Sequence, residues 1–220
     1  MSAARDNRQL GFLTGRPRHV LCVGAHCDDI EIGCGGTLLR FQQDYPSAEF
    51  FWAVFSGDDE RERETVAAAA MIHGRSRHHV DVKRFRASYL PYEGAAVKDA
   101  FEELKRLPAP DVVFTHCLDD RHQDHRLLAE LTWNTFRGHL ILEYEIPKFE
   151  GDLGHPNVFV PLSDATMQRK IEMLESSFSS QRGRSWFTAE TFQGLMRLRG
   201  VECNAPSGYA EAFHGRKVVL

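Results

Sequence analysis

The chain lacks paired cysteines, long apolar runs and a strong charge bias. Its five cysteines, an odd number without CxxC spacing, argue against a disulfide framework and against a zinc ribbon. No window approaches the ~18 apolar residues of a membrane-spanning helix, and residues 1–8 show no signal-peptide core. With 27 Lys+Arg against 31 Asp+Glu, the net charge of −4 leaves no basic field for a nucleic acid. We therefore expect a cytoplasmic protein with neither a nucleic-acid nor a membrane partner.

What the chain has is an alternation of short apolar runs with longer amphipathic stretches, over 220 residues that include 11 histidines. Short apolar runs are typical of strands that are buried on both faces. Before Pro147 such runs cover residues 19–25, 49–55, 79–85, 111–115 and 139–145. The stretches between them predict helices over residues 37–43, 60–73, 96–106 and 125–136.

Strands that alternate with helices predict an α/β fold, with a Rossmann-like, mostly parallel sheet and helices on both faces. After Pro147 the alternation stops, and the pattern predicts a short apolar run at 157–160 and helices at 163–178 and 187–199. No linker precedes this part. We interpret it as a C-terminal extension on the same sheet, so that residues 1–220 form a single domain.

The first segment that carries chemistry, residues 25–37, follows the first expected strand. In open α/β sheets, ligand sites form beyond the carboxyl ends of the strands. His26 and Asp29 are close enough in this segment to bind one metal ion, and Asp28 between them is free for another role. Two alternatives stay open. The Asp pair would cap the next helix, or the glycines would bind a dinucleotide, although residues 33–36 do not fit GxGxxG.

A second polar segment, residues 116–126, follows the fourth expected strand in the same way. In a sheet of order 3-2-1-4-5, the first and fourth strands are neighbours where the strand order reverses, so the two segments face each other. This arrangement places His125 opposite His26 and Asp29. Three protein ligands with a fourth position left for water are typical of catalytic zinc. The alternative is a pair of unrelated, solvated loops.

These residues resemble the PIG-L/LmbE-like family of zinc-dependent N-deacetylases. The family's first motif, AHxDD with a following Gly-Gly-Thr turn, matches residues 25–37. Its HPDH motif matches residues 122–125, with Gln123 in place of proline. Residues 209–213 resemble a stretch near the C-terminus of bacterial sugar and thiol-precursor deacetylases, and the Ser-Gln pair at 180–181 also recurs in that part of the family.

The resemblance implies a role for each motif residue. The zinc ligands that it implies are His26, Asp29 and His125. Asp28 would be the general base, His122 the second catalytic group, and Asp124 the carboxylate that orients His122 and keeps it cationic. The family's substrate-binding arginine corresponds to Arg61 or Arg63, and we assign it to Arg61.

We therefore expect a hydrolase that uses Zn²⁺, or another divalent metal, to remove an acetyl group from an N-acetylated amino sugar or sugar conjugate. Two alternatives stay open. One is the same metal site cleaving another amide, in a thiol conjugate or an antibiotic intermediate. The other is a metal- or sugar-binding module without turnover, against which the intact Asp28 argues. Cys27 is expected to pack rather than to bind metal. The expected partner is the small-molecule sugar, and a homo-oligomer stays open.

Overall fold

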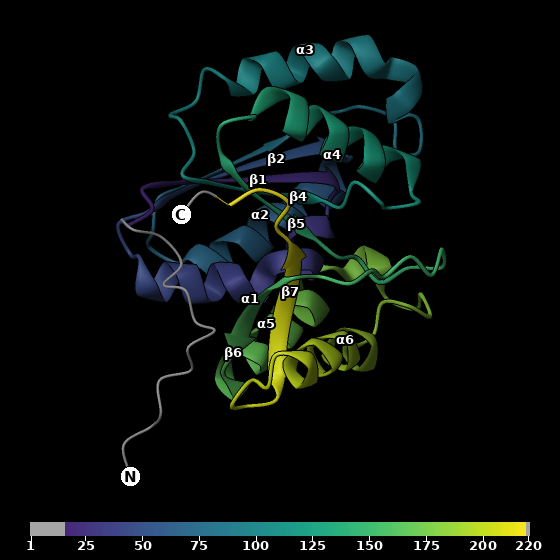
Figure 1. The fold of residues 1–220 in the computed structure, drawn as a ribbon. Coiled ribbons are helices and arrows are strands. Elements are labelled where there is room, and N and C mark those ends of the chain that lie inside the picture. The colour runs from purple at the N-terminus through teal and green to yellow at the C-terminus, as the bar shows by residue number, and fades with distance from the viewer. Residues whose placement is uncertain (1–15, 219–220) are drawn as a thin grey trace.

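The computed structural model describes residues 16–218, and one mixed sheet with helices on both faces organises them (Figure 1). Residues 1–8, which were considered for a signal peptide, lie outside this range. The strands are β1 (His19–His26), β2 (Glu49–Ser56), β3 (His78–Val82), β4 (Val112–His116), β5 (Leu140–Tyr144), β6 (Val158–Leu162) and β7 (Tyr209–His214). The helices are α1 (Asp29–Asp44), α2 (Asp59–His73), α3 (Gly94–Leu104), α4 (Gln123–Thr135), α5 (Asp164–Ser177) and α6 (Ala189–Glu202), with short 3₁₀ turns η1 (Leu90–Glu93) and η2 (Ser179–Gln181).

The sheet confirms the predicted strand order and extends it. The strands run β3-β2-β1-β4-β5-β7-β6, and the first five are parallel to one another. β1 pairs directly with β4, so the strand order reverses between them. The expected run at 157–160 forms β6. The sequence interpretation had no strand at 209–214, and the structure corrects this: β7 lies antiparallel between β5 and β6.

Each face of the sheet has its own apolar core. In Figure 1, α3 and α4 cover one face, while α1, α2 and α5 lie on the other. Val97, Phe101 and Leu128 belong to the core on the α3/α4 side. Leu38 and Met173 belong to the core between α1, α5 and the sheet. Burial on both faces explains why the central strands are continuous apolar runs. None of the helices within residues 16–218 is long and apolar enough to cross a membrane.

The start of α1 differs from the prediction. The sequence pattern placed a Gly-rich turn before a helix at 37–43, whereas the helix already begins at Asp29 and runs through the glycines. The reason is close packing. A Cβ on Gly33 would lie 2.3 Å from a ring carbon of Tyr144, and one on Gly36 would lie 2.6 Å from Leu162. The glycines therefore let α1 approach the strands, and the N-terminus of α1 comes directly after β1.

Candidate metal centre and active site

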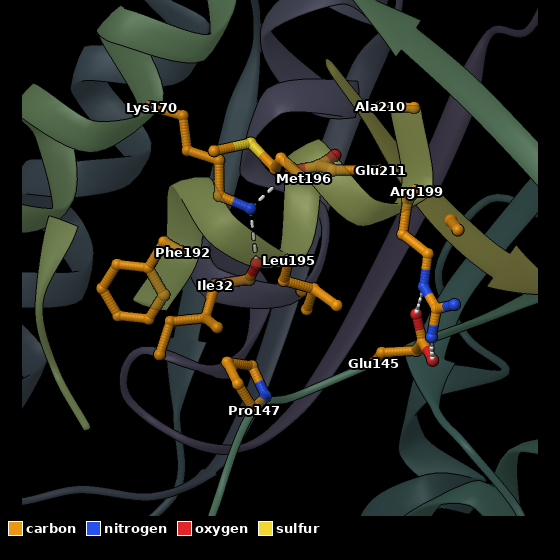
Figure 2. Close-up of a pocket in the computed structure, with 12 residues that line it drawn as sticks. Ile32, Glu145, Pro147, Lys170, Phe192, Leu195, Met196, Arg199, Ala210 and Glu211 are labelled. Atoms are coloured by element: carbon orange, nitrogen blue, oxygen red, sulfur yellow. Dashed lines mark hydrogen bonds and ion pairs between the residues drawn. The ribbon is translucent and has the colours of Figure 1, made fainter. Parts of the chain in front are cut away.

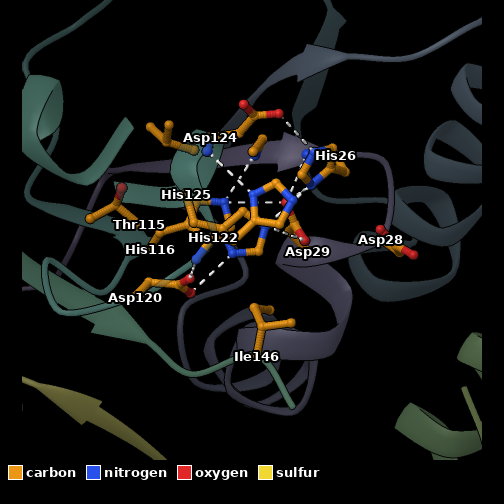
Figure 3. Close-up of polar contacts among 12 residues, drawn as sticks. His26, Asp28, Asp29, Thr115, His116, Asp120, His122, Asp124, His125 and Ile146 are labelled. Carbon is orange, nitrogen blue, oxygen red and sulfur yellow. Dashed lines mark hydrogen bonds and ion pairs between the residues drawn. The ribbon is translucent and has the colours of Figure 1, made fainter. Parts of the chain in front are cut away.

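The two polar segments meet at the carboxyl ends of β1 and β4. His26 is the last residue of β1, and α1 begins three residues later at Asp29. His116 is the last residue of β4, and α4 begins at Gln123. Figure 3 shows the side chains of His26, Asp29 and His125 directed toward one another across this edge. The parallel pairing of β1 with β4 is what brings together segments about a hundred residues apart in the chain.

The three predicted metal ligands lie within hydrogen-bonding distance of one another, or close to it. Nδ1 of His26 is 3.2 Å from Nε2 of His125 and 3.3 Å from Oδ2 of Asp29. Nε2 of His125 is 3.5 Å from Oδ1 of Asp29. Ligands about 2.0–2.1 Å from a tetrahedral zinc are roughly 3.3–3.4 Å apart, and each of these separations is close to that length. His26 faces Oδ2 of Asp29 and His125 faces Oδ1, so the carboxylate presents one oxygen to each ring.

Two further histidines extend the set of possible donors. One group of ring nitrogens within 4.8 Å of one another comprises His26, His122 and His125. A second group within the same distance comprises Asp29, His116 and His125. The predicted trio takes members from both groups, and His125 belongs to each of them. Imidazole and carboxylate donors of this kind suit zinc and other divalent transition metals.

The protonation of His125 suits a metal ligand. Burial, and then the nearby His116, lower the pKa of His125 to about 3, despite the opposing charges of Asp29 and Asp120. The ring is therefore neutral at neutral pH, as a metal-ligating imidazole must be. For His26 burial also lowers the pKa, but Asp29 and Asp124 outweigh it and raise the pKa to about 10. Metal binding at His26 would thus release a proton.

Asp120 is a site residue that the sequence reasoning missed. Its Oδ2 lies 3.0 Å from Nδ1 of His125 and 2.9 Å from Nζ of Lys148. Its Oδ1 accepts a 2.7 Å hydrogen bond from the backbone N–H of His122. Although burial opposes ionisation, the hydrogen bond from His125 and the charge of Lys148 hold the pKa of Asp120 well below its usual range. A metal-bound histidine usually donates its other nitrogen to a carboxylate, so an acidic residue near His125 was the signal available.

His116 was also missed. It is fully buried, and its Nε2 lies 3.2 Å from Oδ2 of Asp29 and accepts the backbone N–H of Ala25 at 2.9 Å. Its ring stacks on that of His125 with centroids 3.9 Å apart. Its position resembles that of His26, since each is the last residue of its strand. That shared position was the sequence signal for placing it in the site.

The carboxylate of Asp28 is not used to cap the helix. Asp28 occupies the N-cap position of α1 but makes no side-chain capping hydrogen bond, so the alternative of a mere cap is not what the structure shows. Instead, Oδ2 of Asp28 lies 3.1 Å from Nη2 of Arg61. Burial raises the pKa of Asp28 to about 6, with Arg61 opposing the rise and Asp29 adding to it. Asp28 can therefore exchange a proton near neutral pH.

Arg61, the predicted substrate-binding residue, is engaged within the protein. Its Nη1 donates to Glu64 at 2.9 Å and to Oγ of Ser180 at 2.8 Å, and its Nη2 donates to the carbonyl oxygen of Cys27. Arg63, the other candidate, is exposed on α2. The structure thus brings Arg61 and not Arg63 to Asp28, and the Ser180 of the predicted Ser-Gln pair helps to hold it there.

Asp124 contacts a different histidine from the one expected. Its Oδ2 lies 3.2 Å from Nε2 of His26 and accepts the backbone N–H of Ser88 at 2.6 Å. Its Oδ1 accepts the N–H of Leu90 at 3.2 Å. The carboxylate therefore binds the backbone at the start of η1 through two hydrogen bonds, and it orients the ring of His26 rather than that of His122.

His122 is accordingly not held as a cation. Its Nδ1 accepts the backbone N–H of Asp124 at 3.2 Å, at the N-cap of α4. Burial and the charge of His26 lower its pKa, despite the raising effect of Asp124. The expectation of a raised pKa for His122 is thus wrong. With Nδ1 accepting, the neutral ring carries its proton on Nε2. As expected, Cys27 packs: it is buried, and its thiol faces the carbonyl of Ser56 at 3.5 Å.

Comparison with known proteins places this arrangement in a family. The family model for GlcNAc-PI de-N-acetylase, PIG-L, matches residues 21–136. The chain belongs to the PIG-L family. It is 32% identical over 139 residues to the uncharacterized deacetylase YaiS of Escherichia coli. The matched region covers 58% of this chain and 74% of YaiS. These matches confirm the family that the sequence motifs resemble, which is a family of deacetylases.

Solved structures share the fold of this PIG-L protein at low sequence identity. The N,N'-diacetylchitobiose deacetylase from Pyrococcus horikoshii superposes with a TM-score of 0.69 at 21% identity, over 90% of this chain and 83% of that one. GalB, the 4-carboxy-2-hydroxymuconate hydratase from Pseudomonas putida, superposes with a TM-score of 0.72 at 16% identity, over 92% and 98%. Because the fold carries both activities, the function has to be argued from the site.

Proposed function

We propose that this PIG-L protein is a zinc-dependent hydrolase that removes an acetyl group from an N-acetylated amino sugar, free or as part of a conjugate. The observation that carries the proposal is the meeting of His26, Asp29 and His125 within 3.2–3.5 Å of one another, with the protonatable Asp28 directly before Asp29 in the chain. A binding module has no use for a buried carboxylate beside the metal ligands, whereas hydrolysis needs a base there. The family description and the name of the P. horikoshii relative support an N-acetyl sugar as the substrate class.

His26, Asp29 and His125 would hold the metal, with zinc as the first choice among divalent ions. A divalent ion there would polarise the substrate amide and lower the pKa of a water. Asp120 keeps His125 in the required tautomer through its Nδ1, and Asp124 does the same for His26 through Nε2. Asp124 is thus a positioning residue rather than a proton donor.

Asp28 carries the proton through the reaction. As the water oxygen attacks the amide carbon, Asp28 accepts the water proton. When the C–N bond breaks, Asp28 returns this proton to the departing amine, and acetate remains as the second product. A carboxyl with a pKa of about 6 suits both steps, because it can be deprotonated before the attack and protonated after it.

His122 stabilises the developing charge on the carbonyl oxygen. Its Nδ1 is occupied by the backbone N–H of Asp124, so its Nε2–H is the donor available to the substrate. The ring acts as a neutral electrophile, which agrees with its lowered pKa. Arg61, whose guanidinium lies on Asp28, is our candidate for contact with the sugar beside the base.

Three further parts of the proposal concern the whole protein. We propose that residues 1–220 form a single domain, because β7, formed by residues 209–214, lies within the sheet that β1 begins. We propose a cytoplasmic location, on the sequence grounds given above. The expected partner is the small-molecule sugar or sugar conjugate, and assembly into a homo-oligomer stays open.

Acetate release from a panel of N-acetyl compounds tests the proposed function. The panel contains N-acetylglucosamine, N,N'-diacetylchitobiose, a nucleotide-linked N-acetyl sugar and two N-acetyl amides without a sugar. We expect zinc-loaded protein to release acetate from at least one sugar and chelator-treated protein to release none. Asp28→Asn should release acetate at least about a hundredfold more slowly than the parent. Release only from the non-sugar amides would favour the alternative amide substrates. A zinc-loaded protein without turnover on the whole panel would contradict the hydrolase proposal.

A further inference from the structure

The middle of α1 is bound by two buried charges from the C-terminal third of the chain. Lys170 of α5 and Glu211 of β7 form an ion pair of 2.6 Å, and each side chain is about 3% exposed. We call this pair the Lys170–Glu211 bridge. Figure 2 shows Lys170 with interactions to Glu211 and to Ile32 of α1. The bridge includes the glutamate of the 209–213 stretch, for which the proposed mechanism has no role.

The bridge binds backbone groups that a regular helix uses internally. Nζ of Lys170 donates to the carbonyl oxygen of Ile32 at 2.5 Å. The backbone N–H groups of Gly36 and Thr37 donate to the two carboxylate oxygens of Glu211, at 2.8 and 2.6 Å. In an uninterrupted α-helix, Gly36 would donate to Ile32. The ion pair therefore contacts both the donor and the acceptor of one helical position in the middle of α1.

The first half of α1 carries the catalytic carboxylates. It begins with Asp28 at the N-cap and Asp29 at the first helical position. The backbone N–H of Ile32 donates to the carbonyl oxygen of Asp28 at 2.9 Å. Ile32 is thus bonded on both sides: its carbonyl oxygen accepts from Lys170, and its N–H donates to Asp28. A displacement of Ile32 by the loss of Lys170 would be passed to Asp28 and Asp29 through one hydrogen bond.

We propose that Lys170 and Glu211 are positioning residues for the reaction, which fix the first turn of α1 and thereby the placement of Asp28 and Asp29. The energetic reason is that a buried ion pair gives little net stability compared with apolar residues of the same size. What such a pair provides here is three hydrogen bonds to the backbone of a glycine-rich helix, and apolar side chains cannot supply them. A misplacement of about 1 Å in a catalytic group is enough to slow a reaction by roughly a hundredfold.

A second buried ion pair beside the bridge supplies the matched control. Arg199 of α6 and Glu145 pair at 2.6 Å, and both line the same pocket as the bridge does (Figure 2). The other hydrogen bonds of Arg199 go to Glu202 and to the carbonyl of Gly154, neither of which belongs to α1. Removing this pair deletes a buried ion pair from the same region without touching α1.

The test compares the double variants Lys170→Met/Glu211→Gln and Arg199→Met/Glu145→Gln with the parent. Removing both charges avoids leaving one buried and unpaired. Circular dichroism and thermal melting establish folding, zinc affinity is measured by chelator competition, and the visible spectrum of the Co²⁺-substituted protein reports the metal geometry. The kinetic arm rests on the proposed function, because it uses acetate release. The zinc and cobalt arms do not use turnover, so they test the bridge even if the parent releases no acetate.

We expect the folded bridge variant to lose about a hundredfold in kcat with less than about a threefold change in KM. We also expect its Co²⁺ spectrum to shift, while the control pair keeps the parental spectrum and turnover. Parental kcat and an unshifted Co²⁺ spectrum in the bridge variant would overturn the proposal. An equal loss in the control would also overturn it, as would a bridge variant that fails to fold where the control folds, since the bridge would then serve stability alone.

Discussion

Replacing Asp120 by asparagine should weaken metal binding without unfolding the protein. The carboxylate faces three donors: Nδ1 of His125, Nζ of Lys148 and the backbone N–H of His122. An asparagine has one oxygen in place of two. If that oxygen faces His125 and Lys148, its NH₂ group meets the His122 N–H, and if it is turned round, the NH₂ group meets His125. One contact is lost in the first orientation and two in the second, because His125 and Lys148 share Oδ2.

The size of the effect follows from the role of such carboxylates. Loss of the partner that orients a metal-bound histidine costs about 10–100-fold in metal affinity, which corresponds to about 1.4–2.8 kcal/mol. Lys148 still has Asp152 at 2.7 Å, so the variant leaves no isolated buried ammonium group. We therefore expect the zinc dissociation constant of Asp120→Asn to rise within that range while the melting temperature changes little.

Chelator competition with a zinc-sensitive dye measures the dissociation constant, and Asp119→Asn is the matched control. Asp119 precedes Asp120 in the chain, but its side chain is 79% exposed and pairs with Arg216. Removing the Asp119 charge tests whether a nearby negative charge alone affects the metal. If both variants bind zinc as tightly as the parent, the reasoning that Asp120 orients His125 is refuted. If both weaken binding equally, the effect belongs to general electrostatics.

Four further predictions follow from named residues. Asp28→Asn should keep its zinc and lose at least about a hundredfold in turnover, and parental kcat/KM should fall as the pH drops through about 6 or somewhat lower, because the base must be ionised and a bound cation lowers its pKa. His125→Ala should lose the metal, whereas His122→Ala should retain it and lose turnover; equal zinc loss in both would make His122 a ligand. Burial, and then a neighbouring histidine, lower the pKa of His73 to about 3, so between about pH 6.5 and 3 only the unfolded state gains its proton. Stability should then fall with decreasing pH by up to about 1.4 kcal/mol per unit, and the slope in melts of His73→Gln should be shallower. Gly33→Ala should destabilise by roughly 3 kcal/mol in denaturant titrations, because the new Cβ would overlap the ring of Tyr144; a parental midpoint would contradict this packing.

The parallel part of the fold was predictable because its signals are local. Each central strand is an apolar run, and the rules for βαβ units leave only a few strand orders, among them the 3-2-1-4-5 order that the structure has. β7 was not predictable in this way, since its antiparallel pairing with β5 and β6 depends on residues far away in the chain. The helical glycines were misinterpreted for a similar reason. Only the position of Tyr144 shows why Gly33 has no side chain.

The candidate site was likewise predictable only in part. The two motifs, the expected pairing of the strands before them and the family resemblance together led to His26, Asp29 and His125, which the structure brings together. The residues that orient them could not be assigned from spacing alone. Asp124 lies two residues from His122, yet its carboxylate reaches His26 on the neighbouring strand. Which carboxylate serves which ring is fixed by the path of the loops between strand and helix, and short-range sequence order does not reveal that path.

The position of β7 has a consequence for how the protein is made. β6 is the edge strand of the sheet, and it joins the rest through β7, the last strand of the chain. While a ribosome is still translating the residues before 209, β6 has no strand beside it, and the carboxylate that binds α1 does not yet exist. Chains emerge and fold from the N-terminus onward, so the five parallel strands can assemble early, whereas α1 receives its last contacts only after β7 is released. A nascent chain stalled at residue 205 should therefore expose an unpaired strand to chaperones and proteases.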